Sequence, residues 1–240
     1  MADLFFLHGW GLSSVVWAST RALLPGATPD LPGYGDSPMV APYSTETLAD
    51  AVAENLAEPT DLVGWSMGGM VALALAARYP ERVRRLVLVG TSPVFAARGD
   101  WSHGMAAPVL AEFAQALKED FRATLLRFLS LQSRGGEEAR AVTARLRERM
   151  RGQAEPRPEA LAAGLELLRA VDLREQARQV RCPALVVHGA HDMLCAPAAG
   201  KWLAGHLPEA RLALHPLAAH APFLSHPEWF VASVKGFLHG

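Results

Sequence analysis

The sequence predicts an α/β fold: a mainly parallel sheet flanked by helices, with an inserted all-helical segment. Three observations lead to this prediction. Short apolar runs alternate with helical stretches from residue 4 to 89. No β-like run occurs between about 95 and 179, and β-like runs resume at 184. We therefore assign 1–94 and 180–240 to an α/β core and 95–179 to a helical lid.

The composition indicates one soluble globular protein, since half of the 240 residues are hydrophobic and the net charge is −1. This charge gives no reason to expect nucleic acid, and no apolar run approaches the roughly 20 residues that cross a membrane. The N-terminus lacks a signal-peptide pattern, and the two cysteines form no disulfide framework. We expect a cytoplasmic monomer without cofactor or metal.

The first expected strand, Leu4 to Leu7, runs into the glycine-rich turn His8-Gly9-Trp10-Gly11-Leu12. Its glycines indicate a close approach of the backbone to another group. A plain strand-to-helix turn is the alternative. The next loop, residues 31–37, is interpreted as a structural connection without a catalytic role, before a helix from Thr45 to Leu56 that Ser44 or Thr45 caps.

The strongest motif is Gly64-Trp65-Ser66-Met67-Gly68-Gly69, between the apolar pair Leu62-Val63 and an Ala-rich helical stretch that ends at Tyr79-Pro80. A serine on such a sharp turn has strained backbone geometry and needs small neighbours. Because Met67 opens the helix, its N–H has no intrahelical partner and can face an oxyanion. The motif is short and can arise by chance, so its strand-turn-helix context decides.

After a buried parallel strand at Leu86 to Val89, the chain becomes helical. Helices are expected at Val109–Leu117, Phe121–Gln132, Glu137–Arg151 and Pro158–Val171. Such an insertion would cover the carboxyl ends of the strands, where open α/β sheets bind ligands.

Two further polar residues follow expected strands. Asp192 comes after the strand from Ala184 to His188, and His220 comes after the strand from Ala210 to His215. A lone loop aspartate is usually solvated, but the order Ser66, Asp192, His220 is that of a serine-hydrolase triad. A serine hydroxyl is a weak nucleophile, so an imidazole must take its proton, and a carboxylate holds that imidazole.

Other histidines near strand ends lack this order. We interpret His8, His188 and His191 as structural or rim residues.

These motifs resemble the α/β hydrolase family over nearly the whole chain, and within it the pimeloyl-acyl-carrier-protein methyl ester esterases of biotin synthesis. The closer resemblance adds Thr91-Ser92-Pro93, Arg127-Phe128-Leu129, Gly164-Leu165-Glu166, Val171-Asp172-Leu173-Arg174 and Ala218-Ala219-His220-Ala221-Pro222-Phe223. It implies a serine carboxylesterase that hydrolyses the methyl ester of a pimeloyl chain carried on an acyl carrier protein.

The resemblance also implies roles for single residues. Trp10 and Met67 would supply the oxyanion-hole N–H groups. Substrate would be bound by Trp10, Ser66, Met67, Phe128, Leu129, Ser130, Leu131, Gln132 and His220. Arg127 and Arg140 match carrier-contacting positions, whereas Arg122 and Arg145 are displaced by one residue from such positions. Further aromatic residues, Phe95, Trp101 and Trp65, could line the pocket or belong to the core.

Charge is consistent with an acidic carrier partner. Between Lys118 and Arg157 the chain has ten Lys or Arg against six Asp or Glu, a local charge of about +4. Solvated helix faces are the alternative explanation.

The sequence departs from the family pattern near its start. Its first strand begins at about residue 3, and the connection from Trp17 to Asp30 is short, so we expect one or two edge strands to be missing. Two other functions remain open: a broad-specificity carboxylesterase for small esters, and a non-catalytic ligand-binding relative.

Overall fold

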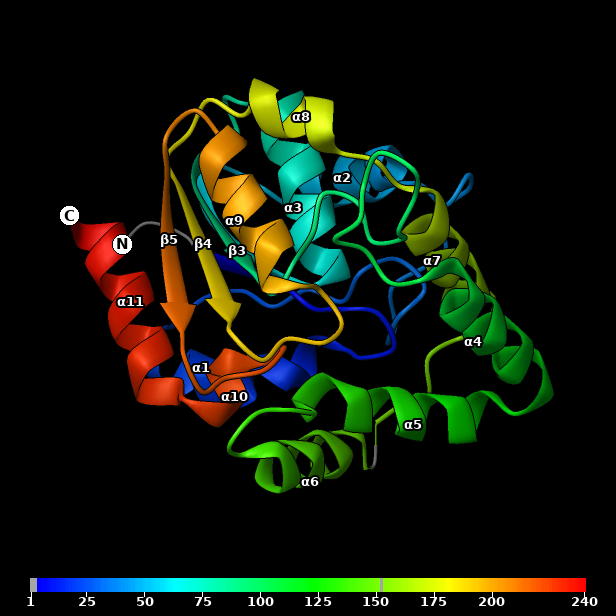
Figure 1. The fold of residues 1–240 in the computed structure, drawn as a ribbon. Coiled ribbons are helices and arrows are strands. Elements are labelled where there is room, and N and C mark those ends of the chain that lie inside the picture. Colours follow the sequence, from blue (N-terminus) through cyan, green and yellow to red (C-terminus); the bar gives the residue numbers. More distant parts are fainter. Residues whose placement is uncertain (1–3, 152) are drawn as a thin grey trace.

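The computed structural model describes residues 4–151 and 153–240 and confirms the parallel sheet. Five strands pair in parallel in their order along the chain (Figure 1). They are β1 (Leu4–Leu7), β2 (Thr60–Trp65), β3 (Val83–Val89), β4 (Ala184–Gly189) and β5 (Ala210–His215).

Among the described residues no further strand follows β1 at this edge of the sheet, as expected from the short connection between Trp17 and Asp30. A 3₁₀ turn η1 (Ser14–Trp17) leads into this connection, and helix α1 (Ala18–Leu23) occupies its first part. Ala27 then forms only an isolated parallel bridge with Phe5, in which Phe6 N donates to Ala27 O at 2.9 Å. Within the described residues, this bridge is all that extends the sheet beyond β1.

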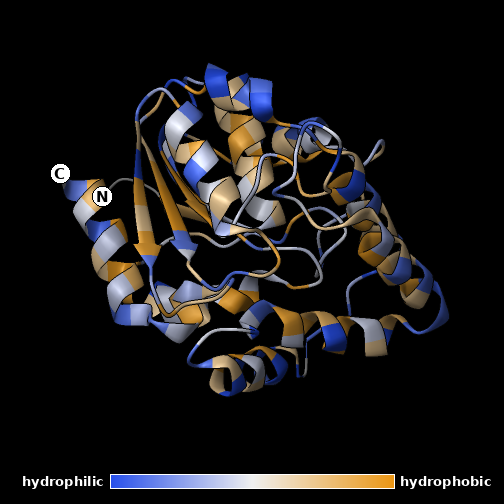
Figure 2. Ribbon diagram, viewed as in Figure 1, coloured by the Kyte–Doolittle hydropathy of each residue, from blue (hydrophilic) through white to orange (hydrophobic). Residues whose placement is uncertain are grey.

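Helices cover both faces of the sheet. One face packs against α2 (Thr45–Ala53), α3 (Met67–Arg78), α8 (Arg174–Gln179) and α9 (Pro197–His206), and the other packs against α1, α10 (Pro222–Ser225) and α11 (Pro227–His239). Strand side chains alternate between the two cores: Leu62 and Leu86 face one, Val63 and Val87 the other. Figure 2 shows these apolar strands enclosed by helices with polar outer sides.

Helix α2 begins as predicted, because the Ser44 hydroxyl accepts from Thr47 N at 3.3 Å and the Thr47 hydroxyl accepts from Ser44 N. It ends at Ala53, earlier than the predicted Leu56, and the backbone continues through Asn55 and Leu56 in tight turns.

Four helices between β3 and α8 form the helical insertion: α4 (Ala107–Glu119), α5 (Phe121–Ser133), α6 (Ala139–Met150) and α7 (Pro158–Ala170). All four were predicted, with ends that agree to within two residues. In Figure 1, α5 and α6 cross the end of the sheet toward which the strands point. Helix α8 lies inside the 95–179 range predicted as lid, yet it packs on α3 and α9. The lid boundaries stay a prediction.

None of the helices formed by the described residues has the length and hydropathy of a membrane span.

Candidate active site

Ser66 sits on the sharp turn that its glycines predicted. Its backbone lies at φ 56° and ψ −120°, the only non-glycine residue with positive φ among those described. Small neighbours are required here: a Cβ on Gly64 would lie 2.4 Å from the Gly68 carbonyl oxygen. A Cβ on Gly68 would lie 2.4 Å from the His8 carbonyl oxygen. The strained φ of Ser66 therefore persists, because the close approach of strand β2 and helix α3 allows the backbone no other conformation.

The sharp turn at Ser66, called the elbow below, is held in place by the end of β3. Ser66 N donates to Val89 O at 2.9 Å, and the Thr91 hydroxyl donates to Ser66 O at 2.7 Å. On the other side, the position of a Cβ on Gly9 would lie 3.2 Å from Ser66 Cβ. The turn after β1 thus packs directly against the serine.

Asp192 lies buried on the turn after β4. Its Oδ1 accepts the backbone N–H groups of Leu194 and Cys195, both at 2.9 Å, and its Oδ2 lies 2.8 Å from His220 Nδ1. Burial alone would raise the pKa of this carboxyl, but the neighbouring imidazoles of His220 and His188 outweigh it and hold the pKa well below its ordinary value. The side chain is an anion at neutral pH.

His220 is fixed on three sides. Its backbone N–H donates to Gln132 O at 3.0 Å, and its carbonyl accepts the Trp65 indole N–H at 2.9 Å. Since the Asp192 carboxylate only accepts, Nδ1 carries the ring proton. Within the described residues, Nε2 has no hydrogen-bond partner. The unprotonated nitrogen thus has no partner, on a ring whose centroid lies 5.5 Å from that of Trp65, the residue before Ser66.

The turn after β1 is ordered by His8, which is fully buried. Its Nε2 accepts from Leu31 N at 2.9 Å, so its Nδ1 carries the proton that it shares with Gly9 O, also at 2.9 Å. Burial lowers the pKa of His8, so the ring is neutral. The prediction of a structural role for His8 and for the loop at residues 31–37 fits this arrangement.

Trp10, next on this turn, is covered by the helical insertion. Its indole N–H donates to Leu161 O on α7 at 2.9 Å, and its ring lies edge-on to Phe128 of α5, 4.8 Å away. A Cβ on Gly164 would lie 2.7 Å from Trp10 Cδ1 and 3.5 Å from the Met67 sulfur. Helix α7 therefore rests on both residues predicted to form the oxyanion hole.

Comparison with known proteins places this geometry in a family. The model of the alpha/beta hydrolase fold family matches residues 4–227. The chain belongs to the α/β hydrolase family.

Two relatives align over nearly the whole chain. A pimeloyl-[acyl-carrier protein] methyl ester esterase of Aromatoleum aromaticum is 42% identical, over 99% of this chain and 98% of its own length. One of Nitrosomonas europaea is 44% identical, over 96% and 93%. Among solved structures, an esterase from Exiguobacterium antarcticum matches with a TM-score of 0.89 at 22% identity, covering 100% of this chain and 92% of that one.

The α5 residues predicted to bind substrate point in different directions in this α/β hydrolase. Phe128 packs on Trp10, and Leu129 turns into the opposite core. Leu131 is half-buried, and Gln132 is buried beside the His220 backbone. Ser130 is exposed, and its hydroxyl donates to the Leu126 carbonyl. Five consecutive helical residues cannot share one face, so the structure brings some of this segment to the site and leaves Ser130 outside.

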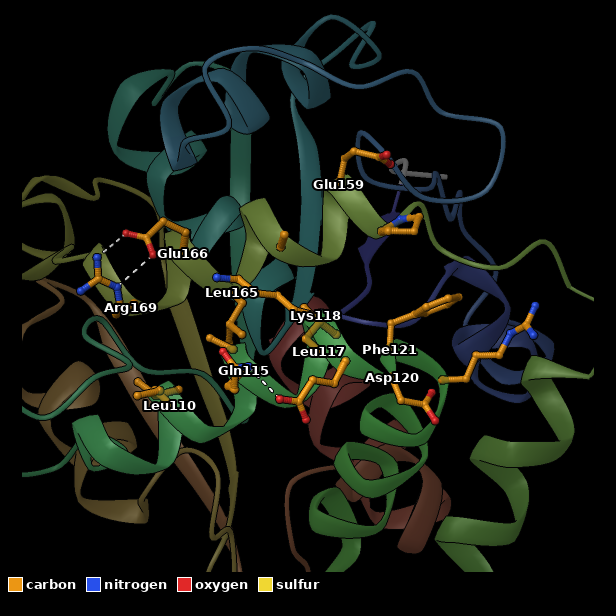
Figure 3. Close-up of a pocket in the computed structure, with 16 residues that line it drawn as sticks. Leu110, Gln115, Leu117, Lys118, Asp120, Phe121, Glu159, Leu165, Glu166 and Arg169 are labelled. Carbon is orange, nitrogen blue, oxygen red and sulfur yellow. Dashed lines mark hydrogen bonds and ion pairs between the residues drawn. The ribbon is translucent and has the colours of Figure 1, made fainter.

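Two of the cavities that adjoin the insertion are of interest here. One, of about 960 Å³, lies between α4, α5 and α7, with Leu110, Leu117 and Leu165 at its base (Figure 3). The other, of about 350 Å³, is lined by α5, α6 and the turn residues Gly11 and Leu12. Because Gly11 follows Trp10, the smaller cavity adjoins the turn that packs against Ser66.

The arginines predicted to contact a carrier differ in their surroundings. Arg127 and Arg140 are exposed, and Arg127 lies over the Phe113 ring, 5.2 Å from its centroid. Arg122 forms a two-bond ion pair with Glu155, at 2.8 and 2.9 Å. Arg145 donates to the carbonyl of Leu224 in α10. The guanidinium groups of Arg122 and Arg145 thus already bind other groups of this chain.

Several contacts were not predicted from sequence. His188 also touches the acid, with Nε2 3.3 Å from Asp192 Oδ2. Gly90, at φ 49°, has a signal that could have been noticed, since a glycine after a strand often marks a close approach; a Cβ there would lie 2.7 Å from His220 O. Gly164 lies inside helix α7, so it does not follow a strand and no comparable signal indicates its contact with Trp10.

The remaining aromatic residues line neither of these two cavities. Trp65 packs on Trp17 and Phe223, and Trp101 packs on Trp202 of α9. Phe95 is buried in the core that contains α3. His191 is exposed on the turn, which agrees with its interpretation as a rim residue.

Proposed function

We propose that this chain is a serine carboxylesterase that hydrolyses the methyl ester of pimeloyl-acyl carrier protein in biotin synthesis. The observation that carries the proposal is His220. Its Nδ1 is bound to Asp192, its Nε2 has no hydrogen-bond partner among the described residues, and its carbonyl accepts the indole N–H of Trp65, the residue before the strained Ser66. It occurs in a chain that is 42% identical, over 99% of its length, to a relative with this activity in its name.

Acylation begins when Ser66 Oγ attacks the carbonyl carbon of the methyl ester, and His220 Nε2 takes the hydroxyl proton. Asp192 stabilises the imidazolium that forms. The carbonyl oxygen becomes an oxyanion, which accepts the backbone N–H groups of Met67 and Trp10. When the tetrahedral intermediate collapses, the bond to the methoxy oxygen breaks, and His220 returns the proton so that methanol leaves.

Deacylation repeats these steps with water as nucleophile. His220 Nε2 takes a proton from water, the hydroxyl adds to the acyl carbon, and the bond to Ser66 Oγ breaks. The proton goes back to Ser66. The products are the restored enzyme and a pimeloyl chain with a free carboxyl group, still attached to its carrier.

The helical insertion would determine the substrate specificity. Phe128, which packs on Trp10, and the half-buried Leu131, which packs against the same core, offer apolar surface for the methylene chain. Arg127 and Arg140, exposed on α5 and α6, would attract an acidic carrier. Arg122 and Arg145 would contribute less, because Glu155 and the Leu224 carbonyl already occupy them. A cytoplasmic monomer fits this role.

The test is kcat/KM for methyl pimeloyl-acyl carrier protein and for a free short-chain methyl ester, each at low and high salt, with Ser66→Ala as blank. We expect a strong preference for the carrier-bound ester that weakens with salt. Equal or better use of the free ester, insensitive to salt, would instead indicate a general carboxylesterase. Ester turnover by Ser66→Ala would exclude both.

A further inference from the structure

A second histidine reaches the carboxylate of Asp192. His188 lies in β4, four residues before the acid, and its side chain is fully buried. Its Nε2 is 2.7 Å from the Cys195 carbonyl oxygen and 3.3 Å from Asp192 Oδ2. Because a carbonyl oxygen only accepts, Nε2 carries the ring proton. The N–H group that binds the Cys195 carbonyl therefore also lies 3.3 Å from the carboxylate oxygen that His220 uses.

His188 also closes the turn that carries the acid. The turn leaves β4 after Gly189, and Asp192 Oδ1 accepts two of its backbone N–H groups, those of Leu194 and Cys195. The bond from the His188 ring to Cys195 O joins the strand to the far side of this turn. The carboxylate is thus held at both oxygens independently of His220.

His188 cannot act as a base toward substrate. Its other ring nitrogen, Nδ1, is buried and has no hydrogen-bond partner in the described ranges. Helix α9 lies against this nitrogen, since a Cβ on Gly200 would be 2.5 Å from it. No substrate atom can approach it, so any effect of His188 on the reaction must pass through Asp192.

The charges around His188 are few. Asp192 faces it directly, His220 shares the carboxylate oxygen, and Leu214 is its apolar neighbour on β5. Burial raises the pKa of the nearby Cys195 thiol, which therefore stays neutral, and Lys201 on α9 is exposed. The negative charge of Asp192 therefore interacts with two imidazole rings, those of His188 and His220.

We propose that His188 is a positioning residue that holds Oδ2 of Asp192 for His220 and takes up part of the negative charge on that oxygen. The proposal rests on the roles proposed above for Ser66, Asp192 and His220. Without His188, the charge on Oδ2 acts on His220 alone. The undivided charge binds the imidazolium form of His220 more tightly, which disfavours the neutral imidazole that must accept the serine proton.

The first test measures the rate constant for inactivation by a fluorophosphonate as a function of pH, in the native protein, His188→Leu and His188→Gln. This reagent reports the reactivity of Ser66 whichever ester is the substrate. For His188→Leu we expect a rate about tenfold lower. We also expect its rise with pH to move to higher pH. A glutamine amide can place an N–H near the original Nε2, so His188→Gln should recover most of both effects.

A His188→Leu protein with the native rate and pH profile would overturn the proposal. So would His188→Gln behaving like His188→Leu, because His188 would then only fill space.

The second test needs no substitution in the protein measured. In native protein labelled with ¹⁵N-histidine, the ring nitrogen shifts of His188, assigned from the missing signals of His188→Gln, should show a proton on Nε2 and none on Nδ1. A proton on Nδ1 would overturn the proposal. If the native protein does not react with the fluorophosphonate, the proposed function fails, and the ¹⁵N shifts still decide the question about His188.

Discussion

The two sides of the site are held in different ways. On the sheet side, the turns after β1, β2, β4 and β5 fix their polar groups through several short bonds each: Asp192 alone accepts two backbone N–H groups and contacts two imidazoles. On the helical side, α5 and α7 touch the site mainly through apolar packing on Trp10 and one backbone bond each.

This difference separates two tasks. Bond-making needs groups fixed to within a fraction of an ångström, whereas substrate choice needs a surface of suitable shape and charge. Changes on the sheet side should therefore abolish turnover of every ester. Changes in the helical insertion should alter which ester is used.

The largest effect should come from the nucleophile or its base. We expect Ser66→Ala and His220→Ala each to lower kcat by roughly 10⁵-fold, for carrier-bound and free esters alike, because the triad acts as a unit. Steady-state kinetics on both substrates measure this. A variant that lost only the carrier-bound activity would break the separation between the two sides.

The elbow glycines come next. Gly68→Ala forces a Cβ to within 2.4 Å of the His8 carbonyl oxygen, and this clash is with backbone, so either β1 or α3 must move. We expect a loss of about 2–4 kcal/mol in the free energy of unfolding, together with loss of activity. Urea denaturation checks it.

The matched control is Gly236→Ala in α11, where a Cβ would meet nothing within 4 Å. It should raise stability by about 0.5–1 kcal/mol, since alanine favours helix over glycine. Equal stability of the two variants would mean that strand β1 and helix α3 do not constrain the elbow.

Gly164→Ala tests the helical side where it meets Trp10, on the turn after β1. Its Cβ would lie 2.7 Å from Trp10 Cδ1, so the indole or helix α7 must shift. We expect kcat/KM to fall about 10- to 100-fold. The unfolding free energy should stay close to native, because the clash involves one side chain at the end of the sheet. Unchanged kinetics would show that α7 does not govern Trp10.

The smallest effect should come from surface charge. Arg127→Ala combined with Arg140→Ala should raise KM for the carrier-bound ester by about tenfold and flatten its salt dependence. Free esters should be unaffected. Arg122→Ala is the comparison variant, and its effect should be smaller, because Glu155 already pairs with Arg122. An equal effect on free esters would argue against a carrier contact.

Much of this architecture could be predicted from sequence because its signals are local. Ser66, Asp192 and His220 each follow an apolar run that forms a buried or half-buried strand, and parallel strands bring their carboxyl ends to one edge. The insertion helices follow from periodicity and from the breaks between them. The short edge beside β1 follows from the length of one connection.

What could not be predicted depends on distant contacts. Arg145 reaches the Leu224 carbonyl, 79 residues away, and Trp10 bonds to Leu161, 151 residues away. His188 looks like an ordinary buried strand residue until the turn after β4 folds back and puts Asp192 beside its ring. No spacing rule identifies such partners, because they depend on how the turns and helices pack.

The central claim is that His220 and Asp192 activate Ser66. The most direct measurement is mass spectrometry of the protein after fluorophosphonate treatment, for the native chain, Ser66→Ala and His220→Ala. We expect one adduct per native chain, located on the peptide that contains Ser66, and almost none in either variant. An adduct on another residue, or full labelling of His220→Ala, would contradict it.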